Sequence, residues 1–306
     1  MRITILGAAA GGGFPQWNCN CRNCAGVRSG SLRAKRRTQS SIFVRDDQAI
    51  DGVLLNASPD ILEQIRANPV LQPARQVRDT AIAGVVLMDG QIDHATGLFM
   101  LRERGSRLPL WCTDPVEQDL TTGNPVLRVL DHYCGVARER IEPDGSAFAI
   151  PGAGALEFRA FALASKAAPY SPHRDAPVPG DNIGMLITDR TSGRKTFYAP
   201  GLGEITPQLF DVMAGADAVF VDGTFWTDDE MIGLGLSKKT ARDIGHLPQS
   251  GAGGMIEWLD QLPAATRRFL IHINNTNPIL DEDSPQRAEL ARHRIEPCVD
   301  GVTIEI

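Results

Sequence analysis

Three cysteines near the start of the chain have the spacing of metal ligands. Cys19, Cys21 and Cys24 form the pattern C-x-C-x-x-C in a segment rich in glycine and asparagine. Thiolates this close together can converge on one tetrahedral ion, and zinc favours such ligands. A redox pair would leave the third cysteine unexplained, and incidental thiols gain little by burial in a polar loop. The pattern therefore predicts a structural Zn²⁺ site whose fourth ligand comes from elsewhere in the chain.

The other cysteines, Cys112, Cys134 and Cys298, are expected to be small buried side chains, although Cys298 is also a candidate for the fourth zinc ligand. The first residues lack the apolar segment of a secretory signal, and no run approaches the roughly 20 apolar residues that cross a membrane. We therefore expect a cytoplasmic protein without membrane insertion, in which disulfides are rare.

A second group of polar residues follows three apolar runs. The group consists of Asp89, Asp93 and His94 after VVLM, Asp222 after AVFV, and His272 within FLIHI. Ligands of sheet proteins gather beyond the carboxyl ends of parallel strands, so these side chains are expected in one crevice. His246, in the segment GHLPQSG, is expected at its rim. Carboxylates and imidazoles together predict a second metal site.

Each member of this group also has a simpler explanation. Asp93 is a suitable N-cap for a helix that begins at Ala95, and His94 is then a surface residue. His272 is explained equally well as a buried neutral imidazole held by a hydrogen bond. Asp222 is harder to explain, because a carboxylate at the end of a buried strand requires a partner. The joint occurrence of these residues favours the metal site.

The elements that must position these residues follow from the pattern of apolar residues. Strands are expected at 2–7, 41–45, 52–57, 82–88, 109–113, 156–163, 183–188, 194–199, 217–222, 268–273 and in the terminal VTIEI. Helices are expected at 59–68, 95–104, 205–213, 251–261 and 285–293. This order predicts one α/β domain over residues 1–306, with two sheets packed face to face and helices on the outer faces.

The net charge of the chain indicates which kinds of macromolecule or surface it is not expected to bind. A formal net charge of -6 argues against nucleic acid or an anionic membrane as the main partner.

The motifs point to a known family. D-x-Q-x-D-H at 89–94 resembles the H-x-H-x-D-H motif of the metallo-β-lactamase superfamily, with Asp89 and Gln91 in place of the first two histidines. Together with PQWNCNCRNC, VDGTFW, GHLPQSG and HINNTNP, it makes the chain similar to the pyrroloquinoline quinone (PQQ) biosynthesis protein B family over essentially its whole length. The resemblance implies an αββα sandwich of two mixed β-sheets, with the metal cleft at the top of the sheets.

The resemblance also implies roles for individual residues. Residues at the active-site ligand positions of the superfamily are Asp93, His94, Asp222 and His272. His246 matches a histidine found beyond the bridging acid, and Ser165 stands near a position where hydrolases supply a further histidine. Phosphodiesterases with the same cysteine cluster complete their zinc with a histidine where this chain has Asn275. Asn275, another group of its loop, or water is therefore the implied fourth zinc ligand.

Compared with the hydrolases of the superfamily, this chain lacks imidazoles at three positions, Asp89, Gln91 and Ser165. Their absence implies one active-site metal ion instead of two. Two histidines and a carboxylate approach the ligand set of non-haem Fe(II) oxygenases. The resemblance implies hydroxylation of the tyrosine ring of a Glu-Tyr unit derived from a precursor peptide, with Fe²⁺ as cofactor and O2 as co-substrate. His246 is either a ligand or a proton relay, and Asp89 and Gln91 orient ligands or substrate.

Two other functions remain open. One is a hydrolase with two metal ions, and the other is a non-catalytic carrier that moves PQQ or its precursor out of the cytoplasm. An anionic dipeptide precursor of PQQ requires a cation at the mouth, and the candidates are Lys166 and Arg174. The basic stretch at 33–45 is more typical of a solvated surface. Other proteins of the PQQ pathway and a homodimer are possible partners.

Overall fold

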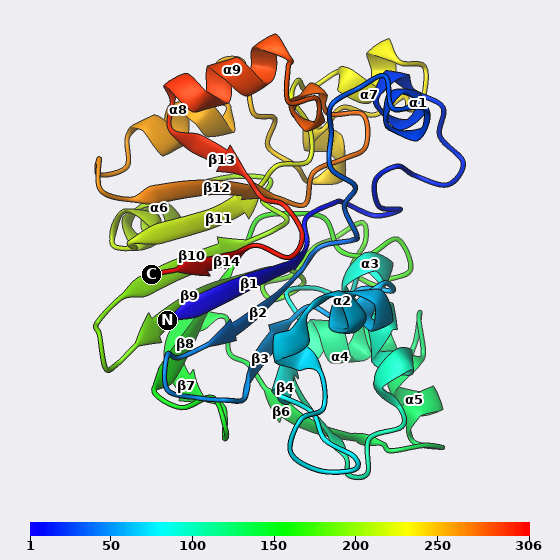
Figure 1. The fold of residues 1–306 in the computed structure, drawn as a ribbon, viewed down its shortest axis with the longest axis vertical. Helices are drawn as coiled ribbons and strands as arrows, with labels where there is room; N and C mark the ends of the chain where they lie inside the picture. The colour runs from blue at the N-terminus through cyan, green and yellow to red at the C-terminus, as the bar shows by residue number, and fades with distance from the viewer.

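The computed structural model describes all 306 residues, which form two seven-stranded β-sheets packed face to face (Figure 1). The first sheet has the spatial order β14 (Thr303–Glu305), β1 (Arg2–Gly7), β2 (Ser41–Arg45), β3 (Gly52–Leu55), β4 (Ile82–Val86), β5 (Leu108–Cys112) and β6 (Val136–Arg140). The second has the order β13 (Ile295–Pro297), β12 (Arg267–Ile271), β11 (Ala218–Asp222), β10 (Lys195–Ala199), β9 (Ile183–Asp189), β8 (Leu156–Ala162) and β7 (Asp144–Ala149).

Both sheets mix parallel and antiparallel pairs. β1 and β2 run antiparallel, whereas β3, β4, β5 and β6 run parallel to one another. In the second sheet β10 to β13 are parallel, and β7, β8 and β9 are antiparallel. The prediction of two mixed sheets is confirmed.

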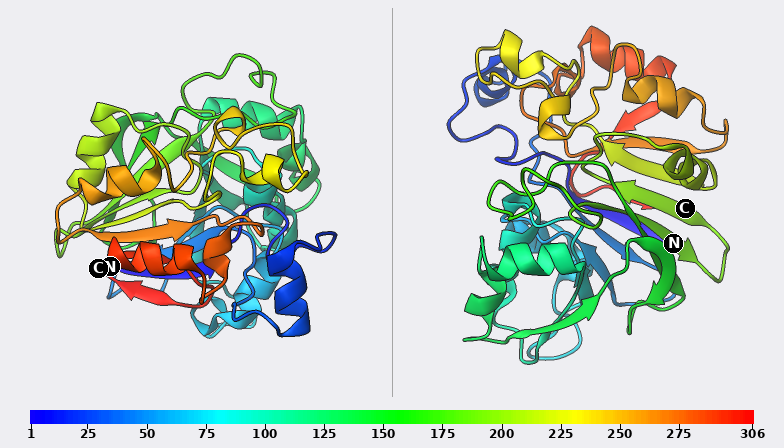
Figure 2. Two further views of the ribbon diagram at one scale, coloured as in Figure 1. Left: turned by 90° about the horizontal axis from the view of Figure 1, so that it is seen from above. Right: turned by 180° about the vertical axis from the view of Figure 1, so that it is seen from behind.

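Helices cover the outer face of each sheet (Figure 1). Those over the first sheet are α2 (Ile61–Ala67), α3 (Ile92–Ala95), α4 (Asp114–Thr121) and α5 (Val126–Leu130). Those over the second are α6 (Pro207–Ala214), α8 (Met255–Asp260) and α9 (Pro285–Arg292). The remaining two, α1 (Arg22–Ser29) and α7 (Glu230–Gly233), lie together beyond one end of the second sheet. The views from above and from behind in Figure 2 show the same four layers, which confirm the predicted αββα sandwich.

Each layer boundary has its own apolar cluster because the strands are buried on both faces. Along β2, Ile42 and Val44 belong to the cluster between the sheets, and Phe43 belongs to the cluster under the helices of the first sheet. Alternate side chains of a strand point to opposite faces, which explains this division. The burial makes both sheets rigid supports for the residues at their ends.

The helix predicted over 95–104 is wrong in its start and its type. A short turn, α3, begins at Ile92, and a 3-10 helix follows over Thr96–Leu101. Gly97 lets this segment pack closely against the loop before α2, because its backbone N–H donates to the carbonyl of Ala57 at 2.9 Å and a Cβ there would lie 2.0 Å from the Ser58 carbonyl oxygen. Asp93 therefore lies inside the first helical turn and is not the N-cap.

Three strands and four helices were not predicted. The missed strands are β6, β7 and β13, and the missed helices are α1, α4, α5 and α7. β6 and β7 are edge strands with mostly exposed side chains, so they lack the apolar signal of buried strands. The helix predicted to begin at residue 251 begins at Met255, because Gly251 and Gly253 adopt left-handed conformations (φ 84° and 68°).

The carboxyl ends of β4, β11 and β12 lie at the right-hand end of the molecule in Figure 1, close to α1, α3 and α7. The two chain termini meet at the opposite end, where the Met1 ammonium group lies 3.3 Å from the carbonyl oxygen of Ile306. None of the helices combines the length and the apolar character that a membrane span requires. The fold thus gathers several strand ends at one edge, where the predicted polar groups are found.

Candidate metal centres

The three cysteines converge at the start of α1. Their Sγ atoms lie within 4.8 Å of one another. Cys21 is the N-cap of α1, and its Sγ accepts a hydrogen bond from the backbone N–H of Cys24. Burial raises the pKa of the Cys21 thiol to about 11, so an ion that binds there must displace a proton. Three convergent sulfurs fit a zinc ion.

Asn275 is the fourth side chain at this cluster. Its amide nitrogen lies 3.1 Å from Sγ of Cys19 and 3.4 Å from Sγ of Cys24. The backbone carbonyl oxygen of Asn275 accepts a hydrogen bond from the side chain of Asn23 at 3.1 Å, which ties the two segments together. Rotation of the amide about its last side-chain bond would place Oδ1 where Nδ2 now lies. Cys298 is elsewhere, buried between the two sheets, and does not contribute.

A second group converges where three strands end. Asp93 and His94 lie in α3, beyond β4, and His272 follows the last residue of β12. Nε2 of His272 lies 3.1 Å from Oδ2 of Asp93, and Nε2 of His94 lies 3.9 Å from the same oxygen. The structure therefore brings together residues that are 179 positions apart in the chain.

The ring of His94 is oriented by Asp89. Its Nδ1 lies 2.8 Å from each carboxylate oxygen of Asp89, and an ionised carboxylate only accepts, so Nδ1 carries the proton. Nε2 of His94 is buried and has no hydrogen-bond partner. Burial opposes the charged ring, but Asp89 and Asp93 raise the pKa of His94 to about 9. A buried nitrogen without a partner, aimed at a carboxylate, fits a bound cation.

The surroundings of Asp93 favour the ionised form of its carboxylate. Burial acts against the charged form, but His94 and His272 lower the pKa of Asp93 below its ordinary value. The backbone of His272 lies in the left-handed region (φ 60°), which is costly for a residue with a side chain. Backbone strain of this kind is found where the fold holds a side chain in one orientation. The side chain of His272 is oriented toward Asp93.

Asp222 closes the site from the side of β11, and its carboxylate is fully hydrogen-bonded. Oδ1 accepts from the backbone N–H and the hydroxyl of Thr224 at 2.9 and 2.5 Å. Oδ2 accepts from the backbone N–H of Leu202 at 2.9 Å and from Nδ1–H of His246 at 2.6 Å. These four donors fill the lone-pair positions of the carboxylate. An ion that binds Asp222 therefore has to displace one of them.

His246 and His272 stand side by side, with ring centres 5.5 Å apart and an interplanar angle of 17°. Asp222, His246 and His272 form a second potential metal group, which shares His272 with the first. Burial opposes the charged form of His246, whereas Asp222 raises the pKa of the ring. His246 therefore lies inside the centre and not only at its rim.

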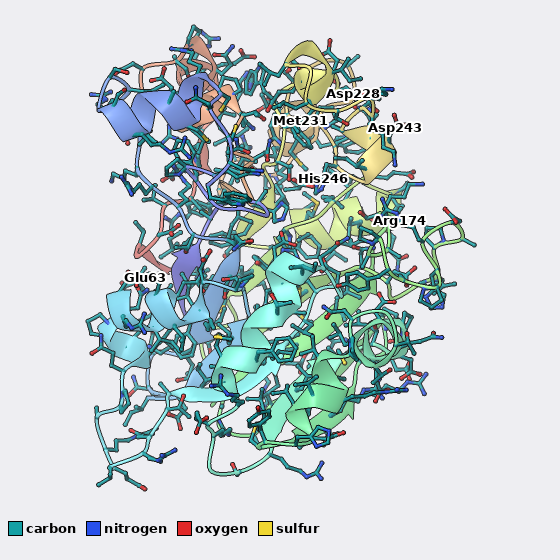
Figure 3. All side chains as sticks on the ribbon, turned by 90° about the vertical axis from the view of Figure 1, so that its right-hand side faces the viewer. Glu63, Arg174, Asp228, Met231, Asp243 and His246 are labelled. Atoms are coloured by element: carbon teal, nitrogen blue, oxygen red, sulfur yellow. The ribbon has the colours of Figure 1, made fainter.

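A cavity of about 410 Å³ opens onto these residues. Gln91, Ser165 and Arg174 are among the residues that line it. Figure 3, which faces this end of the molecule, labels three of the lining residues, Met231, His246 and Arg174. Lys166 is not part of the lining, and its backbone carbonyl instead accepts a hydrogen bond from Asn182 at 3.2 Å.

A residue that contacts three members of the centre was not foreseen from the sequence. Thr224 is 3% exposed, and its hydroxyl contacts Asp222, His246 and His272. The signal was available in VDGTF, because a threonine two residues after an aspartate commonly donates to that carboxylate in a local turn.

The chain resembles known proteins along its whole length. The family model for the beta-lactamase superfamily domain matches residues 52–273. The chain is 61% identical over 306 residues to the coenzyme PQQ synthesis protein B of Azoarcus sp. (strain BH72), with 100% of both chains covered. It is 61% identical over 305 residues to the protein of the same name from Methylobacillus flagellatus, with 99% of each covered.

Solved structures agree with these relatives. Zn(2+)-bound PqqB from Methylobacterium extorquens matches with a TM-score of 0.89 at 34% identity, with 100% of both chains covered. A diphosphatase of the PhnP family matches with a TM-score of 0.68 at 18% identity, covers 100% of this chain and 98% of its own, and shares the fold. With relatives this similar over the full length, the chain belongs to the coenzyme PQQ synthesis protein B family within the β-lactamase superfamily.

Proposed function

We propose that this protein acts in PQQ biosynthesis as an Fe(II)- and O2-dependent enzyme that hydroxylates the tyrosine ring of a Glu-Tyr precursor. The names of its relatives support the pathway. The observation that carries the chemistry is the convergence of Asp93, His94 and His272 on one point. Two imidazoles and one carboxylate with open positions are the ligand set of non-haem Fe(II) oxygenases.

The shared histidine supports a single ion. The two potential groups, Asp93 with His94 and Asp222 with His246, both need His272. A neutral imidazole has one unprotonated nitrogen and therefore serves one ion at a time. The group with Asp93 leaves Nε2 of His94 free for the ion, whereas the group with Asp222 requires loss of an existing hydrogen bond. Asp93, His94 and His272 would thus hold the ion, with Asp222 as a further candidate ligand.

The bound ion would supply activation of O2 beside the substrate, with one oxygen atom entering the ring and the other leaving as water, and the two electrons that this requires would come from an external reductant. The residues around it position the two reactants. Asp89 holds the ring of His94, and Gln91 borders the cavity within reach of a substrate group.

His246 is placed to move a proton. Its Nδ1–H donates to Asp222, so its other ring nitrogen, Nε2, is left to accept a proton from a phenol in the cavity. Asp222 then stabilises the imidazolium that forms, because the carboxylate is buried and 2.6 Å from Nδ1.

Arg174 is the candidate for binding the anionic groups of the substrate. It is the single lysine or arginine that lines the cavity. A guanidinium binds a carboxylate through two parallel hydrogen bonds. The cavity of about 410 Å³ lies in the range of roughly 300–1,000 Å³ found for small-molecule sites.

The test is oxygen uptake after anaerobic loading with Fe(II), with the Glu-Tyr dipeptide as substrate and an added two-electron reductant in every sample. We expect substrate-dependent O2 consumption, loss of that consumption in His272→Ala, and full consumption in the matched control His132→Ala, whose side chain is exposed. Uptake that persists in His272→Ala would remove this residue from the ligands.

The same assay separates the competing functions. A metal-dependent hydrolase, which the group of Asp222, His246 and His272 favours, would release product with Zn²⁺ or Mn²⁺ and without oxygen. A carrier would bind PQQ or its precursor with no oxygen uptake under any loading. Either result overturns the proposed hydroxylase.

A further inference from the structure

Thr224 lies at the centre of the hydrogen bonds that join three side chains of the metal centre. Its Oγ1 is 2.5 Å from Oδ1 of Asp222, 2.9 Å from Nδ1 of His272 and 3.1 Å from Nδ1 of His246. It is also 3.0 Å from the carbonyl oxygen of His272. A hydroxyl has one proton to donate and two lone pairs to accept with, so these contacts cannot all be of the same kind.

The proton of the hydroxyl belongs to the contact with Asp222. A distance of 2.5 Å is typical of a hydroxyl that donates to an ionised carboxylate, and such bonds are about twice as strong as neutral ones. The carbonyl of His272 is a neutral acceptor at a longer distance. Oγ1 of Thr224 therefore faces the histidines as an acceptor.

The direction of the hydrogen bond between Thr224 and His272 shows which ring nitrogen of His272 carries a proton. Nδ1 must be the protonated nitrogen, since it lies 2.9 Å from an oxygen that accepts. With Nδ1 committed to Thr224, Nε2, which lies 3.1 Å from Oδ2 of Asp93, is the nitrogen left to bind an ion, and that ion would take the place of the proton that Nε2 shares with the carboxylate. His246 does not compete, because its own Nδ1 lies closer to Asp222, at 2.6 Å.

We propose that Thr224 is a positioning residue that fixes His272 in the tautomer whose Nε2 faces the metal ion. Asp222 orients the hydroxyl, the hydroxyl orients the ring, and the ring presents Nε2 beside Asp93. Asp89 does the same directly for His94. This inference rests on the proposed metal centre. It adds Thr224 as the residue that orients one of the ligands, His272.

Two substitutions separate the hydroxyl from the shape of the side chain. Thr224→Val keeps the branched shape and removes the hydroxyl, and Thr224→Ser keeps the hydroxyl. Thr196→Val is the matched control, because Thr196 is also buried, lies in β10, and has a hydroxyl without a hydrogen-bond partner.

The probe is Co(II), titrated in competition with a chromophoric chelator into full-length protein whose thiolate site already holds zinc. Loss of a group that orients a metal-bound histidine weakens binding by about 10–100-fold. We expect that loss in Thr224→Val, and affinities close to the unsubstituted protein in Thr224→Ser and Thr196→Val. Equal affinity in Thr224→Val, or an equal loss in Thr224→Ser, would overturn the assignment.

A second measurement does not depend on the folding of a variant. In the zinc-loaded protein with ¹⁵N-labelled histidine, NMR should find His272 protonated at Nδ1, with a slowly exchanging proton. Binding of zinc through Nδ1 of His272 would contradict the inference. Neither measurement uses O2 or the dipeptide, so a failure of the proposed hydroxylation would leave both results interpretable.

Discussion

Nδ1 of His94 lies 2.8 Å from both carboxylate oxygens of Asp89, at a position where the superfamily motif has a histidine. This contact leaves Nε2 of His94 without a hydrogen-bond partner. In the proposed centre Asp89 would thus orient a ligand without being one, which would favour one bound ion over two.

Asp89→Ala should weaken metal binding at the active site. The loss expected for a group that orients a liganding histidine is about 10–100-fold in affinity. Competition with a chelator measures it, and Asp175→Ala, which changes an exposed aspartate, serves as control. If Asp89→Ala bound Co(II) as tightly as the control, Asp89 would have no part in orienting His94.

Cys21→Ala should remove most of the zinc from the cysteine cluster and lower stability. A metal present at roughly 1,000 times its Kd stabilises the folded chain by about 4 kcal/mol, and this contribution would be lost. Metal analysis and urea unfolding check the prediction. Cys134→Ala, away from the cluster, should retain both zinc and stability. The oxygen uptake of the folded fraction should not change.

Arg174→Ala should weaken binding of the Glu-Tyr dipeptide by about 10–100-fold, since a hydrogen bond to a charged group contributes about 1.5–3 kcal/mol. Calorimetric titration of the metal-loaded protein measures the change. Lys166→Ala should have little effect, because Lys166 does not line the cavity. An equal loss in the two variants would argue for a general effect of charge instead of a specific contact.

Glu230 should make stability depend on pH near neutrality. Burial raises the pKa of its carboxyl to about 7, although the hydroxyl of Thr276 and the backbone N–H of Trp226 act in the opposite direction. The folded state thus holds a proton that the unfolded state releases near pH 4.5. Stability contributed by that proton is lost as pH rises from about 4.5 to about 7, by up to about 3 kcal/mol.

Glu230→Gln tests this directly, because the amide resembles the protonated carboxyl in size and in having both a donor and an acceptor. Urea unfolding at pH 5 and pH 8 should find the variant similar to the unsubstituted protein at the lower pH and more stable at the higher one. A constant difference between the two proteins at all pH values would place the titration elsewhere.

The sequence predicts those residues of the site that lie at strand ends or close together in the chain. Asp222 ends β11 and His272 follows β12, which are neighbouring parallel strands, and the carboxyl ends of such strands lie together whatever the loops do. Cys19, Cys21 and Cys24 are close in sequence, so their convergence needed no knowledge of the fold.

The remaining features depend on atoms that sequence patterns do not describe. The four hydrogen bonds that fill the carboxylate of Asp222 involve the backbone N–H of Leu202, 20 residues away, which no motif signals. Lys166 and Arg174 look equivalent in sequence, yet the path of the loop places only Arg174 at the cavity. Edge strands such as β7 were not predicted, because most of their side chains are exposed and their sequences therefore lack the apolar pattern of buried strands.

The central claim is that Asp93, His94 and His272 hold one metal ion. X-ray absorption spectroscopy at the iron edge, on protein with zinc in the cysteine cluster and Fe(II) added without oxygen, tests it most directly. We predict one iron per chain, bound by two imidazoles and otherwise by oxygen, with no metal neighbour. A second metal at about 3.5–4 Å from the iron, as in two-metal hydrolases, would contradict the account.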